Sequence, residues 1–89
     1  MPGAGPIDNL DELDDWRGAN LRGQNLRGRD MAGRNLSGAI FTQADLREAN
    51  MNGAFLTGAL LIGARLRGAG LHGADLTGAN LAGADLTQA

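Results

Sequence analysis

The sequence lacks both cysteine and lysine, and its aromatic residues are one tryptophan and two phenylalanines. Without cysteine, no disulfide can stabilise the fold, and this absence fits a cytoplasmic protein. No run of about eighteen apolar residues occurs, so we expect no membrane-spanning helix. The first segment, MPGAGPIDNLDELDDW, also lacks the basic and apolar regions of a signal peptide. We therefore expect one small domain in the cytoplasm.

The sequence also lacks the groups of residues on which catalysis and metal binding depend. It has a single histidine, His72, and no cysteine–histidine cluster, carboxylate pair or serine with a basic partner is visible. The glycine pattern GAGLHG at residues 68–73 resembles a dinucleotide-binding loop, but it follows a five-residue repeat and opens no helix. We expect no enzymatic activity, no metal and no cofactor.

The net charge of −2 conceals an asymmetry between two parts of the chain. Residues 1–15 carry five carboxylates and no basic side chain. Residues 16–89 carry all eight arginines and the other five carboxylates, which gives this part a net charge of +3.

An apolar residue recurs at every fifth position over most of the chain. Two places before it, the residue is alanine in eleven of fifteen pentads; one place before, it is Asp or Asn in ten; two places after, it is Gly in twelve. The fifteen central residues of the pentads are Trp16, Leu21, Leu26, Met31, Leu36, Phe41, Leu46, Met51, Leu56, Leu61, Leu66, Leu71, Leu76, Leu81 and Leu86.

A period of five fits neither a helix nor a flat strand, because it forms no single apolar stripe on either. Alanine and the central residue, two apart, point to the same side of an extended segment, and the Asp or Asn between them points outward. Glycine permits the backbone angles of a corner. If each corner is about a right angle, four pentads close one coil, and stacked coils lie about 4.8 Å apart.

The pentads ADLTG (74–78), ANLAG (79–83) and ADLTQ (84–88) resemble the motif A(D/N)LXX of the pentapeptide-repeat family. The resemblance covers residues 14–89 and implies an all-β solenoid, a right-handed quadrilateral parallel β-helix. The pentads of this chain predict about 3.75 coils. We expect residues 1–13 to be a leader and cap, and residues 14–89 to be the β-helix.

Both ends of such a rod need a cover. In the leader, Ile7, Leu10 and Leu13 recur at intervals of three and predict a short helical cap. Gln24, Arg29 and Arg34 replace the inward alanine in three consecutive pentads. We expect the two arginines to contact the acidic leader in partly buried pairs, with an anion pocket at that end as the alternative.

At the other end the chain stops within one residue of the last pentad. We expect this end to be uncapped and to expose leucines, so end-to-end homodimerisation is our first hypothesis. Related proteins of the family pair through their C-terminal coils, which supports the same expectation. The candidate residues are Leu71, Leu76, Leu81 and Leu86.

Two surfaces along the rod depart from the motif. Ile40, Phe55, Leu60 and Ile62 are apolar at outward positions and form a candidate partner surface, although scattered exposed apolar residues are also ordinary. Arginines follow one another in register on another side and form a candidate anion stripe. Asp45 and Glu48 lie close to them, so a partly neutralised, solvated side is the alternative. The stripe consists of Arg27, Arg47, Arg65 and Arg67.

These features predict a non-catalytic protein-binding or scaffold module that works through its sides, as a homodimer and with an unknown protein partner. The resemblance also suggests one alternative, a DNA mimic that modulates DNA gyrase, as in quinolone-resistance members. The arginine stripe suggests another, a binder of an anionic partner. The net positive charge of the coils argues against a DNA mimic. The lack of aromatic platforms argues against nucleic-acid binding.

Overall fold

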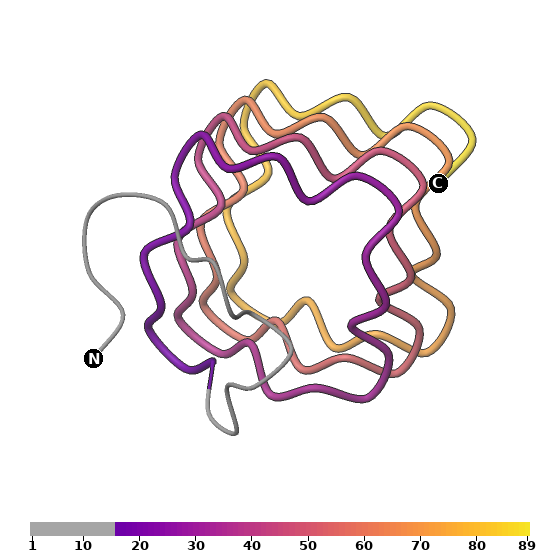
Figure 1. Cartoon of the computed structure of the whole chain (residues 1–89). Helices are drawn as coiled ribbons and strands as arrows, with labels where there is room; N and C mark the ends of the chain where they lie inside the picture. The colour runs from indigo at the N-terminus through magenta and orange to yellow at the C-terminus, as the bar shows by residue number, and fades with distance from the viewer. Residues whose placement is uncertain (1–15) are drawn as a thin grey trace.

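The computed structural model describes residues 16–89, which wind around one axis with a four-sided outline (Figure 1). Parallel bridges always join residues twenty positions apart. Four pentads therefore complete one coil, as the repeat predicts. The bridges define four sides: the first through Asn20, Ile40, Leu60 and Asn80; the second through Asn25, Asp45, Arg65 and Asp85; the third through Asp30, Asn50 and Gly70; the fourth through Asn35, Phe55 and Asp75.

Residues 16–89 contain no helix, and each stretch of strand is a single bridge residue between two-residue turns. In each turn, the amide before the bridge residue donates to the preceding central carbonyl, as Ala19 does to Trp16 at 3.1 Å. The third residue of this turn has a positive φ, 67° at Gly18, as a type II turn requires. Glycine at this position makes the corner of the coil.

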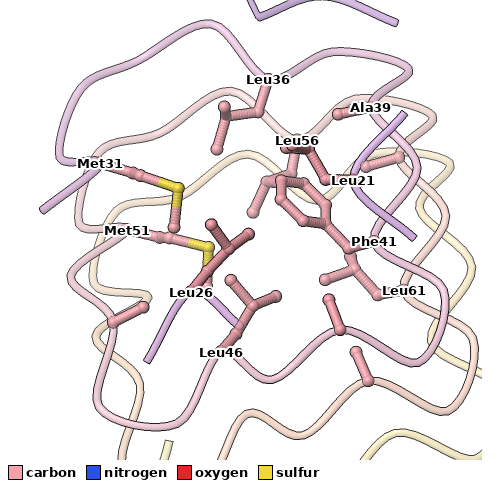
Figure 2. Packing of buried hydrophobic residues seen from close by; sticks show 14 of the residues in the cluster. Leu21, Leu26, Met31, Leu36, Ala39, Phe41, Leu46, Met51, Leu56 and Leu61 are labelled. Atoms are coloured by element: carbon pink, nitrogen blue, oxygen red, sulfur yellow. The ribbon is translucent and has the colours of Figure 1, made fainter. Parts of the chain in front are cut away.

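The axis of the solenoid is filled by the central residues and the alanines that precede them. From Trp16 to Leu66 every central side chain is buried, and so are the alanines from Ala39 to Ala69. Figure 2 shows Met31 and Met51 on one side of this core, with Leu26 and Leu46 beside them. The predicted inward positions of alanine and leucine are confirmed.

Two predictions concern residues that lie partly or wholly outside the described range. The count of about 3.75 coils includes the pentad that begins at residue 14. The helical cap and its residues Ile7, Leu10 and Leu13 lie outside residues 16–89. Both stay predictions.

Candidate functional site

The outward Asp and Asn side chains fix the corners of the coil. All nine of them within residues 16–89 accept a hydrogen bond from the amide two residues later, at 3.0–3.2 Å. Asn20, for example, accepts from the amide of Arg22. Because these side chains point outward, the amides that they satisfy also face the outside of the solenoid.

One complete coil lacks this arrangement. Phe55, Leu60, Arg65 and Gly70 occupy the outward position in four consecutive pentads, one on each side of the solenoid. We call residues 55–74 the non-consensus coil. The amides of Thr57, Ile62 and Arg67 have no hydrogen-bond acceptor within residues 16–89, and neither has the amide of Thr42, which follows Ile40.

The structure brings three of the four predicted apolar residues onto one side. Ile40 and Leu60 are bridge partners in adjacent coils of the first side, and Ile62 follows in the same segment. Leu60 and Ile62 are 36% and 37% exposed, and Ile40 is half-buried. Phe55, 50% exposed, lies on the fourth side, which precedes the first along the chain. Their outward position is confirmed, whereas a partner stays a prediction.

Two arginines of the predicted stripe have carboxylate partners. Arg47 donates to Asp45 through Nε at 2.8 Å and Nη2 at 2.6 Å. This bidentate contact, chiefly through its hydrogen bonds, lowers the pKa of Asp45 from 3.8 to about 2 and raises the pKa of Arg47. Arg27 lies 3.2 Å from Glu48, but both side chains are more than half exposed, so this pair stabilises little.

The other two arginines of the stripe, Arg65 and Arg67, make no ion pair within residues 16–89. Arg65 bridges between Asp45 and Asp85, yet the carboxylate of Asp45 is held by Arg47. Asp85 accepts from the amide and hydroxyl of Thr87, and these hydrogen bonds lower its pKa. The side is therefore partly neutralised, as the alternative proposed, and Arg65 and Arg67 are its two arginines without an ion pair in residues 16–89.

The first coil carries the inward polar residues that the sequence singled out. Gln24, Arg29 and Arg34 are half-buried, and each makes polar or charged contacts. The guanidinium carbon of Arg34 lies 5.2 Å from the ring centroid of Trp16, a cation–π contact that fixes this arginine at the rim of the core. The predicted contacts with the leader concern residues outside the described range.

The last coil exposes more of its core than the coils before it. Leu71, Leu76 and Leu81 are half-buried, and Leu86 is 40% exposed. The amides of these four leucines have no acceptor within residues 16–89. Within residues 16–89, these amides are therefore available to further backbone.

Sequence reasoning missed the pair formed by Asn52 and Gly70. The Oδ1 atom of Asn52 accepts from the amide of His72, one coil later, at 2.9 Å. A signal was present, because Gly70 removes the side chain that normally binds this amide. Asn52 lies eighteen residues before Gly70 and twenty residues, which is one coil, before His72.

Within residues 16–89, no group of three or more His, Cys, Asp or Glu side chains could hold a metal ion. In the same range, no helix is long and apolar enough to cross a membrane.

The family model for pentapeptide repeats matches residues 15–43, 30–61 and 56–89, so this chain belongs to the pentapeptide-repeat family. Members of the family fold as right-handed quadrilateral β-helices, in agreement with the four sides observed. They are generally non-catalytic structural or binding proteins. The chain accordingly has the fold of a repeat scaffold.

Solved structures of the family are similar to this chain. HetL, a pentapeptide repeat protein of the cyanobacterium Nostoc involved in heterocyst differentiation regulation, is 40% identical, with a TM-score of 0.52 over 78% of this chain. A second pentapeptide repeat protein of Nostoc is 40% identical over 86% of this chain, with a TM-score of 0.47. A pentapeptide repeat protein of the Arabidopsis thaliana thylakoid lumen is 35% identical over 97% of this chain, with a TM-score of 0.49. The chain spans 35%, 68% and 53% of these proteins, respectively. No curated protein matches the chain.

Proposed function

We propose that the protein is a non-catalytic binding scaffold that recognises a partner protein through the sides of its solenoid. The observation that supports this proposal is the replacement of outward Asp or Asn by exposed apolar side chains in the middle of the rod. Leu60 and Phe55 are exposed at positions where the repeat otherwise places a polar residue that stabilises the corner. Clusters of exposed apolar side chains on a small protein mark an interaction surface.

We further propose that the protein forms a homodimer, either through its C-terminal edge or through the first side. The open edge offers amides and half-buried leucines to a second copy, whereas the first side offers Ile40, Leu60 and Ile62. Both arrangements bury apolar surface that is exposed in a single chain.

Solution mass from sedimentation equilibrium at micromolar concentrations tests the dimer directly. Leu86→Asp should dissociate an end-to-end dimer, and Leu60→Asp should dissociate a dimer through the first side. Asn80→Asp is a matched control, because it adds the same charge on the first side and keeps an acceptor for the amide of Ala82. A monomer at every concentration would refute the dimer, and a dimer insensitive to both Asp variants would refute both surfaces.

HetL is involved in heterocyst differentiation regulation. Because the chain spans 35% of HetL, the role of that protein is not transferred to this one. The cytoplasmic location expected from the sequence stays a prediction.

A second candidate function, binding of an anionic partner, rests on Arg65 and Arg67. Neither guanidinium group forms an ion pair within residues 16–89, so an external anion can interact with them. Salt-dependent retention on heparin, lost in Arg65→Gln/Arg67→Gln, would support this function. Retention that does not respond to salt would contradict it.

No feature of the described residues favours a DNA mimic. A mimic requires ordered negative charge along its sides, whereas residues 16–89 carry eight arginines and five carboxylates. A gyrase supercoiling assay tests this alternative. Inhibition at low micromolar protein would favour a DNA mimic over the proposed binding scaffold.

A further inference from the structure

We propose that the non-consensus coil binds an extended segment of a partner protein in which apolar side chains are followed by a carboxylate. The segment would lie along the coil, across the first side and onto the second. This inference rests on the proposed scaffold function and identifies the class of partner.

The first argument concerns backbone amides. Most outward amides within residues 16–89 are satisfied by a side-chain oxygen, but those of Thr57, Ile62 and Arg67 have no acceptor. The amide of Thr42 lies one coil before that of Ile62 on the same side and is equally unsatisfied. An extended peptide offers carbonyl oxygens at regular intervals, which suits a set of outward donors.

The second argument concerns the apolar contacts. Leu60 and Ile62 stand two residues apart on either side of the buried Leu61, and Ile40 lies beside Leu60 through their bridge. Asn20 and Asn80 flank this group along the same column. The first side therefore has an apolar centre and polar ends, the arrangement typical of a recognition surface.

The third argument concerns charge. The chain turns one corner after Ile62 and reaches Arg65 and Arg67 on the second side. Neither arginine forms an ion pair within residues 16–89, and the nearby Asp45 is already bound by Arg47. A carboxylate that follows the apolar residues of the segment would meet these two guanidinium groups.

A membrane surface also combines apolar and anionic groups, but the amides argue against it. Inserting Leu60 and Ile62 into lipid would carry the amide of Ile62 into a medium without acceptors, which is unfavourable. A peptide satisfies the same amide.

The test compares the wild-type chain with a restored variant, Phe55→Asn/Leu60→Asn/Arg65→Asn. These substitutions reinstate the repeat motif and give the three amides local acceptors, so the variant should fold at least as stably as the wild type. A phage-displayed library of random twelve-residue peptides is selected on the immobilised full-length wild type. Ala32→Asn, an outward change on the third side, is the control.

We expect the selected peptides to contain apolar residues followed by Asp or Glu. Measured by fluorescence anisotropy, they should bind the wild type and Ala32→Asn equally, and the restored variant at least about tenfold more weakly. Raising the salt from about 0.1 M to about 1 M should weaken binding to the wild type because the charges are screened. Arg67→Gln, at an exposed position, should reduce this salt dependence without changing the fold.

Peptides without acidic residues, peptides that bind the restored variant equally, or no enrichment at all would overturn the inference. So would retention of the wild type on vesicles of anionic phospholipid without peptide binding, which would identify a membrane surface instead. These results leave the homodimer proposal to its own test, the solution mass of the wild type and of Leu60→Asp. The two proposals can therefore fail separately.

Discussion

Asn52 binds the amide of His72 across one coil of the solenoid, with its Oδ1 atom 2.9 Å from the nitrogen. Gly70, two residues before His72, occupies the position where most pentads carry Asp or Asn. A Cβ atom on Gly70 would lie 2.8 Å from the same Oδ1 atom. Asn52 thus takes both the space and the hydrogen bond of the side chain that Gly70 lacks.

This relationship predicts that substitutions at residues 52 and 70 are not additive. Asn52→Ala should lower the free energy of unfolding by about 0.5–1 kcal/mol, because the amide of His72 loses its acceptor. Gly70→Asn should be nearly neutral, since the new side chain displaces Asn52 but accepts from the same amide. In the Gly70→Asn background, Asn52→Ala should then cost almost nothing.

Urea denaturation of the four proteins of this double-mutant cycle measures the coupling directly. Gly70→Ala is the control, because its methyl group displaces Asn52 without supplying an acceptor and should therefore destabilise the fold. Equal effects of Asn52→Ala in both backgrounds would contradict the relationship.

The turns predict a second effect, at corners that do not carry glycine. Gln43 and Glu48 adopt φ values of 59° and 62°, in the left-handed region. This conformation costs a non-glycine residue about 1–2 kcal/mol. Glycine removes this cost, but the greater conformational freedom of glycine in the unfolded chain offsets part of the stabilisation. We expect Gln43→Gly to raise the free energy of unfolding by up to about 1 kcal/mol.

The converse substitution isolates the backbone effect. A Cβ atom at Gly58 would meet nothing within 4 Å, so Gly58→Ala tests its φ of 68° and not packing. It should destabilise the fold by about 1–2 kcal/mol in thermal or urea unfolding. No change in Gly58→Ala, or a loss of stability in Gln43→Gly, would contradict the turn geometry.

Most of the fold could be predicted because each pentad repeats one local rule. The apolar residue at every fifth position, the alanine two places before it and the glycine two places after it define a side and a corner. If each corner turns the chain by about a right angle, four pentads close one coil of twenty residues. The cap could not be tested, since Ile7, Leu10 and Leu13 lie outside the described residues.

The candidate site was less predictable, because it depends on contacts between coils. Departures such as Leu60 and Arg65 were visible in the sequence, but the loss of acceptors for the amides of Ile62 and Arg67 was not. The sequence also did not show which arginine forms an ion pair with Asp45. Asp45 binds Arg47, two residues away, whereas Arg65, its bridge partner, forms no ion pair within residues 16–89.

The burial gradient along the rod predicts that equivalent leucines contribute unequally. Leu46 is fully buried, whereas Leu86, two coils later on the same side, is 40% exposed. Leu46→Ala should cost about 2–5 kcal/mol because it leaves a cavity in the core. Leu86→Ala should cost about 1 kcal/mol, since it removes less buried area. Equal losses of stability in urea would show that the last coil is covered as well as the centre.

The contact between Asp45 and Arg47 predicts a stability that depends on pH. Because the pKa of Asp45 in the folded protein is about 2, below its ordinary 3.8, the pair stabilises the fold fully above pH 3.8 and is lost as the pH falls toward 2. Arg47→Gln should lower the free energy of unfolding at neutral pH, and this difference should vanish near the lower pKa. Urea unfolding of both proteins across this range measures it, with Arg27→Gln, from an exposed pair, as the control. A difference that persists at low pH would show that Arg47 stabilises the fold by packing instead of charge.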